Sequence, residues 1–184
     1  MKIVAIVGSP RLKGNTNYLV DCALDEANRL VIETEKIVLG EHDVRPCLGH
    51  DYCASLDSCL QKDDAAWILN KFRNADGVIL ATPVYYYNIS AQMKAFIDRN
   101  YFIYKHEQEY LARAVGLIVV AEQIGIDDTL HTLRQFADEF SLAGDRVFVA
   151  SGYATKLGDI KSNPSLVEAA ADVGRQMAES LLVA

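Results

Sequence analysis

Five short apolar runs, separated by segments with helical periodicity, restrict the folds that are open to this chain. The run at 114–121, AVGLIVVA, carries no polar side chain, and neither does the run at 2–7 after its first residue. Strands without period-two alternation are typical of a parallel sheet that is covered by helices on both faces. The five runs lie at 2–7, 35–39, 77–82, 114–121 and 146–150. Joined by right-handed crossovers, they predict an α/β doubly wound three-layer sandwich with a five-stranded parallel sheet.

The segments between these runs predict helices. One helix follows the first run, where apolar residues from Leu19 to Leu30 recur at helical spacing. The others are expected at 64–72, 90–99, 128–142 and 164–182. With 184 residues, of which 51% are apolar, the chain can bury a substantial core. No repeat or linker divides it, so residues 1–184 are expected to form a single domain.

Charge and hydropathy favour a small partner in the cytoplasm. The net charge is −7 and the isoelectric point is about 5.0. Polyanions are held mainly by clustered Lys and Arg, so we expect no nucleic-acid partner. The apolar run near the amino terminus is short for a signal peptide, and no later stretch approaches the roughly 20 apolar residues that cross a bilayer. We therefore expect a cytoplasmic protein with no membrane contact and a small-molecule partner.

The loop GSPRLKGNTN follows the first predicted strand and suggests an anion site. In an open parallel sheet, ligands bind beyond the carboxyl ends of the strands. Gly8 and Gly14 allow the backbone to approach a ligand closely, and the next helix presents unpaired N–H groups at its start. The polar donors of the loop are Ser9, Arg11, Asn15, Thr16 and Asn17. Together they predict a cradle for a small phosphate ester, and the alternative is an ordinary helix cap at Asn15 or Thr16.

Other phosphate-binding motifs fit this loop less well. It lacks the Gly-Lys-Ser/Thr ending of a nucleoside triphosphate loop, and it has two glycines where a dinucleotide fingerprint has three. The first strand also ends in Gly8 and Ser9 rather than in the acidic residues expected of a receiver-type signalling domain.

A second loop, in the stretch TPVYYYNISAQMKAFIDR, ends the third predicted strand and should face the same crevice. Pro83 stiffens the exit of the strand, and the tyrosines at 85–87 can present flat apolar faces. Asn88 and Ser90 can cap the next helix. The loop therefore predicts a planar ring as its ligand. The alternative is that the tyrosines pack against a neighbouring subunit or the edge of the sheet.

The chain resembles the NAD(P)H-dependent FMN reductases and iron–sulfur flavoproteins of the flavodoxin-like superfamily. The resemblance is carried by the stretches VGSPRLKGNT and TPVYYYNISAQMKAFIDR and by the cysteine-bearing segment between them. The resemblance covers nearly the whole chain and implies a flavodoxin-like sheet of order 2-1-3-4-5 with FMN as cofactor. The implied contacts to the FMN phosphate are Ser9, Arg11, Asn15, Thr16 and Asn17. The implied contacts to the isoalloxazine ring, including backbone hydrogen bonds to its polar edge, are Pro83, Val84, Tyr85, Tyr86 and Asn88. The loop at 122–127 should complete the pocket.

The resemblance also implies an activity. It is that of an FMN-dependent oxidoreductase that takes a hydride from NAD(P)H as co-substrate and passes electrons to a flavin, a quinone or another acceptor. No catalytic side chain is assigned, because hydride transfer needs no protein nucleophile. The alternatives are an electron-transfer flavoprotein without direct nicotinamide use and a non-catalytic sensor of a phosphate ligand. Members of the family usually pair, so a homodimer is expected, with a tetramer as the alternative and residues 100–111 as the contact.

The segment RPCLGHDYCASLDSC raises the question of a metal. It places Cys47, His50, Cys53 and Cys59 with gaps of two, two and five residues. In the iron–sulfur flavoproteins that the chain resembles, a compact run of cysteines at this place binds a four-iron cluster, normally through four thiolates. Here His50 stands where a cysteine is expected. We predict a metal-free loop, with an iron–sulfur cluster on these four residues or a zinc ion as alternatives.

Overall fold

The computed structural model describes residues 1–139 and 146–183, and within them five strands form one all-parallel sheet of order β2-β1-β3-β4-β5. This is the flavodoxin-like order that was predicted. The strands are β1 (Lys2–Val7), β2 (Glu33–Val38), β3 (Gly77–Pro83), β4 (Ala114–Ala121) and β5 (Val147–Tyr153). The α-helices are α1 (Asn15–Arg29), α2 (Ala65–Arg73), α3 (Ala91–Arg99), α4 (Tyr101–Lys105), α5 (Ile126–Glu139) and α6 (Pro164–Leu182). Short 3-10 helices are η1 (Leu39–Glu41), η2 (Cys53–Ser55) and η3 (Asp159–Ser162).

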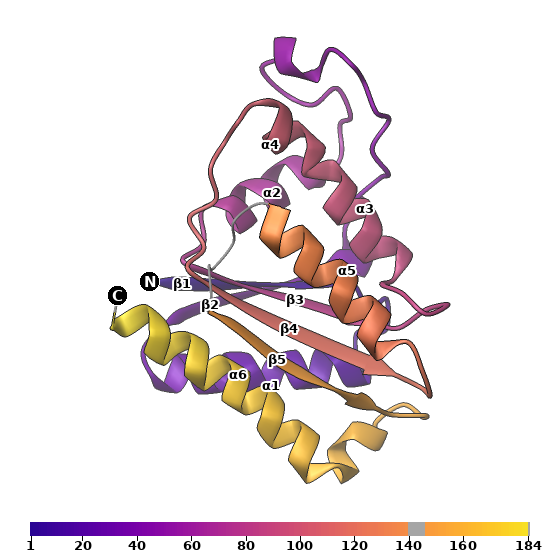
Figure 1. The fold of residues 1–184 in the computed structure, drawn as a ribbon, viewed down its shortest axis with the longest axis vertical. Helices are drawn as coiled ribbons and strands as arrows, with labels where there is room; N and C mark the ends of the chain where they lie inside the picture. The colour runs from indigo at the N-terminus through magenta and orange to yellow at the C-terminus, as the bar shows by residue number, and fades with distance from the viewer. Residues whose placement is uncertain (140–145, 184) are drawn as a thin grey trace.

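Helices cover both faces of the sheet, as the apolar runs predict (Figure 1). Along β1, the side chains of Ile3, Ala5 and Val7 pack in one core with α1 and α6. Val4 and Ile6 point to the opposite core, which is formed with α2, α3 and α5. Every residue of β4 is buried, because this strand lies inside the sheet with helices above and below it. No helix of residues 1–139 and 146–183 is long and apolar enough to cross a membrane.

The boundaries differ from the predicted ones at a few ends. β5 continues to Tyr153, three residues beyond the apolar run, because Ser151–Tyr153 still pair with Val119–Ala121 of β4. The short helix α4 was not predicted. The helix expected at 128–142 is α5, which begins earlier at Ile126, and residues 140–142 of that prediction lie outside the described residues.

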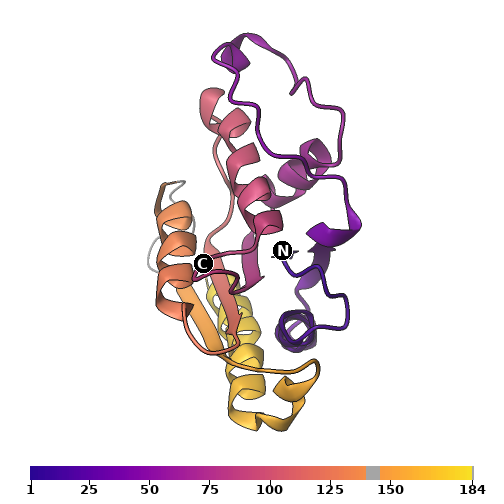
Figure 2. The same ribbon diagram turned by 90° about the vertical axis from the view of Figure 1, so that its right-hand side faces the viewer.

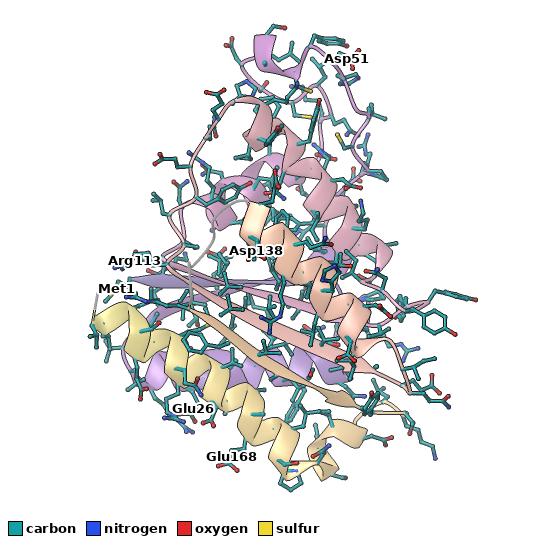
Figure 3. All side chains as sticks on the ribbon, viewed as in Figure 1. Met1, Glu26, Asp51, Arg113, Asp138 and Glu168 are labelled. Atoms are coloured by element: carbon teal, nitrogen blue, oxygen red, sulfur yellow. The ribbon has the colours of Figure 1, made fainter. Side chains whose placement is uncertain are left out.

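The segment between η1 and α2 stands apart from the layers. Figure 2 shows it extending away from the sheet on the side of α3 and α4. Figure 3 labels Asp51 at its outer end. The segment starts from the carboxyl end of β2, and the loops that follow β1, β3, β4 and β5 gather at the same edge, because parallel strands all end there.

Candidate functional site

Four loops at the carboxyl edge of the sheet surround a hollow of about 150 Å³. The loops that follow β1 and β3 were predicted to meet here, and they do. The loops after β4 and β5 complete the wall. The lining residues are Ser9, Arg11, Gly14, Asn15, Thr16, Pro83, Val84, Tyr85, Val120, Ala121, Glu122, Ala154, Thr155 and Leu157. Seven of the ten predicted contacts are therefore in one place, and the other three, Asn17, Tyr86 and Asn88, are not among the lining residues.

One end of the hollow is suited to an anion. Helix α1 begins there with Gly14 as its N-cap, so no side chain accepts a hydrogen bond from the N–H groups of the first turn, which also lacks acidic residues. The hydroxyl-bearing residues Ser9 and Thr16 are buried at the wall, 3% and 2% exposed, and Arg11 adds a positive charge. A helix start with free N–H groups attracts a negative group. The alternative of a cap by Asn15 or Thr16 is wrong, because glycine takes that position.

The loop after β1 is held by its own hydrogen bonds. The Gly14 N–H donates to the carbonyl of Arg11 at 2.8 Å, and the side-chain amide of Asn17 donates to the same carbonyl at 3.0 Å. Asn17 is 1% exposed, and its Oδ1 has no hydrogen-bond partner within the described part of the chain. Asn17 therefore shapes the turn from behind rather than lining the hollow.

Asn15 has a bridging position that the sequence did not indicate. Its Nδ2 donates to the carbonyl of Lys156 at 2.8 Å, and its Oδ1 accepts from the Gly158 N–H at 2.9 Å. The side chain thus ties the start of α1 to the loop after β5, which supplies Ala154, Thr155 and Leu157 to the wall. The available signal was positional, since a loop that follows the last parallel strand must reach the same edge.

The other end of the hollow is formed by Pro83, Val84 and Tyr85. Tyr85 and Asn88 close a tight turn by exchanging two backbone hydrogen bonds, of 2.8 and 3.1 Å. The two central residues have positive φ, 47° at Tyr86 and 68° at Tyr87. Such values at both central positions are typical of a type I′ turn, which favours Asn and Gly.

This turn leaves fewer free N–H groups than expected. The N–H of Val84 donates to the carbonyl of Val120 at 2.8 Å, and those of Tyr85 and Asn88 are used within the turn. The expectation that these three residues offer backbone N–H groups to a ring edge is therefore not met. Within the described residues, the N–H groups of Tyr86 and Tyr87 have no acceptor. Asn88 does not cap α3, since its Oδ1 accepts from the adjacent Ile89 N–H.

Ser90 connects the two predicted loops. It caps α3 by accepting from the Met93 N–H at 3.2 Å, and its hydroxyl donates to the carbonyl of Gly8 at 2.7 Å. Gly8 has no room for a side chain, because a Cβ there would lie 2.7 Å from Ser90 Oγ and 2.8 Å from Met93 Cβ. The anion end and the aromatic end of the hollow are thus fixed relative to each other.

A second region of possible chemistry is the cysteine loop, which we define as residues 43–63. Its two ends are joined by hydrogen bonds, from the Arg45 N–H to Asp63 Oδ2 at 3.1 Å and from the Gln61 amide to the Pro46 carbonyl at 3.0 Å. Arg99 at the end of α3 pairs with Asp63, and their side chains are 2% and 0% exposed. The outer part of the cysteine loop is open, with Leu48 66% exposed.

Arg99 also contacts a backbone carbonyl and a cysteine sulfur of this loop. Its Nη1 donates to the Arg45 carbonyl at 3.1 Å and its Nη2 to Cys59 Sγ at 3.4 Å. Burial raises the pKa of Asp63, but the hydrogen bonds from Arg99 and from backbone N–H groups outweigh it and hold that pKa below its usual value. Burial also raises the pKa of the Cys53 thiol, and the nearby thiols of Cys47 and Cys59 raise it further.

The arrangement does not fit a bound metal ion. Within the described residues, no group of three or more His, Cys, Asp or Glu side chains is placed to hold one. His50 instead stacks on Tyr52, with ring centroids 5.2 Å apart. Three thiols and an imidazole are suitable donors for iron or zinc, but as arranged they do not converge on one ion, so we route no chemistry through a metal here.

Comparison with known proteins identifies the family of this chain. The sequence profile of the NADPH-dependent FMN reductases matches residues 1–154. An iron–sulfur flavoprotein of Methanocaldococcus jannaschii is 35% identical, over 97% of this chain and 96% of the relative. An iron–sulfur flavoprotein of Archaeoglobus fulgidus is 39% identical over 68% of this chain, and the match spans only 56% of that relative.

The fold has solved counterparts as well. The crystal structure of RosB with a bound 8-demethyl-8-formylriboflavin-5′-phosphate intermediate has a TM-score of 0.77, with 18% sequence identity. The superposition covers 100% of this chain and 81% of that one. At this identity, the likeness establishes the fold alone.

Proposed function

The chain is a flavoprotein oxidoreductase of the NADPH-dependent FMN reductase family, and from this premise we propose its reaction and its cofactor site. It takes a hydride from NADH or NADPH and passes electrons to a small-molecule acceptor. The electrons pass through FMN, which is held at the carboxyl edge of the sheet. The observation that carries the proposal is the single hollow that joins an anion end, with Arg11 and the start of α1, to an aromatic end with Tyr85. FMN has the same two parts, a phosphate and a planar ring.

Each end of the hollow would have its own part in holding FMN. Ser9, Arg11, Thr16 and the N–H groups at the start of α1 would bind the phosphate. Pro83, Val84 and Tyr85 would cover the ring and exclude water from it. Asn15 would act indirectly, since its side chain is already used to hold the loop after β5. When bound, FMN supplies the hydride and electron chemistry, and the protein orients it and adjusts its environment.

The phosphate part of the proposal is tested by titrating the protein with FMN and with riboflavin, which lacks the phosphate. Replacing Arg11 with Ala should weaken FMN binding roughly ten- to hundredfold, because a charge-assisted hydrogen bond is worth about 1.5–3 kcal/mol. Riboflavin binding should not change. Lys13→Ala is the matched control, since Lys13 is exposed in the same loop but does not line the hollow. An absence of saturable FMN binding, or an equal loss for both ligands, would contradict the proposal.

The second candidate is an electron-transfer flavoprotein that takes electrons from a protein donor. It is favoured by the name of the relatives, iron–sulfur flavoprotein. Iron and acid-labile sulfide would be measured in anaerobically purified protein together with its absorption spectrum. Stoichiometric iron and sulfide with negligible NAD(P)H oxidation would favour this candidate. Rapid NAD(P)H oxidation with an added quinone would favour the reductase.

We also propose that the protein is a homodimer, with a tetramer as the alternative. Its contact would include the open groove of about 390 Å³ between α4 and α5, where Tyr101 and Tyr104 lie. Tyr104 is 54% exposed there, and tyrosine is common at interfaces. Sedimentation analysis should show a dimer that Tyr104→Glu shifts towards monomer, and an unchanged assembly would exclude this face.

A further inference from the structure

A second hollow of about 350 Å³ adjoins the proposed FMN pocket, and two residues, Val84 and Glu122, line both. Its other lining residues are Tyr86, Tyr87, Gln123 and Ile124. Tyr86, Tyr87 and Ile124 are 98%, 57% and 58% exposed, so large apolar side chains stand uncovered beside the pocket. Flat aromatic and aliphatic surfaces of this kind favour a planar apolar ligand.

The walls of this second hollow are fixed to each other by the backbone. Gly125, in the loop after β4, has a φ of +91°, and a Cβ there would lie 2.8 Å from both Tyr87 Cα and Val84 Cγ1. The loop after β4 therefore packs directly on the tyrosine turn. The positive φ values of Tyr86 and Tyr87 are unfavourable for residues with side chains, and such strain is concentrated at binding sites.

The charge of the second hollow comes from one residue. Glu122 is the charged member of its lining, and it makes no ion pair with any residue of 1–139 or 146–183. An unpaired carboxylate repels anions and attracts cations nearby, and the chain's net charge of −7 acts in the same direction. The apolar surfaces would hold a ring, and the carboxylate would oppose any negative group attached to it.

We propose that Glu122 selects the electron acceptor by charge, so that the second hollow takes a planar aromatic acceptor that is uncharged or cationic and disfavours an anionic one. The proposal rests on the proposed function, because an acceptor in this hollow is useful only if FMN lies in the adjoining pocket. It makes Glu122 a specificity-determining residue and leaves the transfer of electrons to FMN itself.

The test uses the protein loaded with oxidised FMN, without an electron donor, and two bicyclic ions of opposite charge, N-methylquinolinium and naphthalene-2-sulfonate. Their dissociation constants would be measured by calorimetry at low ionic strength. The wild type should bind the cation more tightly, and Glu122→Gln should reduce the cation-to-anion preference roughly two- to fivefold, the range for one partly exposed charge pair. Added salt should reduce the preference of the wild type.

Asp138→Asn is the matched control, because it makes the same change in net charge at an exposed residue near the far end of α5 (Figure 3). An equal preference in the wild type and Glu122→Gln, an equal effect of the control, or no binding of either ion would overturn the inference. The FMN content is measured first on the same sample. A protein that does not retain or bind FMN overturns the proposed function, whereas FMN binding without charge preference overturns only the role of Glu122.

Discussion

The carboxyl edge of the sheet and the cysteine loop both carry polar chemistry, but they are built in opposite ways. At the edge, short loops follow directly from buried strands and are joined across the sequence by side chains such as Ser90 and Asn15. The cysteine loop is one long excursion, joined mainly to itself near its two ends. It is joined to the body of the protein by the buried pair of Arg99 and Asp63 and by a contact of 2.9 Å between His106 Nε2 and the Leu56 carbonyl.

The difference teaches what each region is suited to do. Several independent hydrogen bonds from rigid elements hold the loops around the hollow in place. A site that binds two parts of one ligand needs such fixed positions. A loop that is held to the body of the protein through few side chains, chiefly Arg99 and His106, can change as a unit when Arg99 is altered. Helix α3 connects the two regions, since its N-cap Ser90 is bonded to Gly8 in the loop after β1 and its last residue, Arg99, contacts Cys59.

The largest effect should come from removing Arg99. Arg99→Leu leaves the Asp63 carboxylate buried without its partner, which costs about 3–5 kcal/mol of unfolding free energy. Urea denaturation measures this loss. If the two regions are as independent as their hydrogen bonds indicate, the affinity for FMN should change less than about threefold, a small difference on the free-energy scale.

Two further variants make the Arg99 result interpretable. Arg175→Leu removes a comparable pair with Asp172 on the surface of α6, where the side chains are 45% and 42% exposed, and should cost at most about 1 kcal/mol. Arg99→Lys keeps the charge without the forked geometry and should lie between wild type and Arg99→Leu. A tenfold loss of FMN affinity in a folded Arg99 variant would show that α3 couples the regions.

Acid should weaken the same pair. The pKa of Asp63 is lower in the folded protein than its ordinary value near 4, so its stabilising contribution is fully present above about pH 4 and is lost as pH falls through the folded value. The unfolding free energy of the wild type should therefore fall more steeply below pH 4 than that of Asp63→Asn. Parallel profiles would mean that the ionised pair adds nothing to stability.

The sequence predicted these two regions to different degrees. Apolar runs and helical spacing were enough for the layers, the sheet and the meeting of the loops after β1 and β3, because burial on both faces leaves few alternatives. The ion pair that anchors the base of the cysteine loop was not predictable, since its partners Arg99 and Asp63 are 36 residues apart and no local pattern joins them. The bridge from Asn15 to residues 156–158 was missed for the same reason.

Asn15→Ala should have the next largest effect, and it acts at the edge. The change removes two hydrogen bonds that hold the loop after β5, at roughly 0.5–1.5 kcal/mol each in unfolding free energy. FMN affinity should fall together with stability, unlike in Arg99→Leu, because that loop forms part of the wall. Asn163→Ala, which removes the cap of α6, is a control for a hydrogen-bonding Asn away from the hollow. An equal effect of the two variants on FMN binding would contradict the bridging role.

The smallest expected effect has the opposite sign and lies in the tyrosine turn. Tyr86 and Tyr87 occupy the two positive-φ positions of a type I′ turn, where Asn followed by Gly is favoured. The double variant Tyr86→Asn/Tyr87→Gly should stabilise the protein by about 1 kcal/mol, because a left-handed conformation costs a residue with a side chain about 1–2 kcal/mol and both rings are largely exposed. Thermal unfolding measures the gain.

The same variant should lose affinity for planar ions in the second hollow, since it removes two of its apolar walls. A gain in stability with unchanged binding would mean that the strain of this turn is not kept for the ligand, and would remove the tyrosines from the acceptor site while leaving FMN in the first hollow.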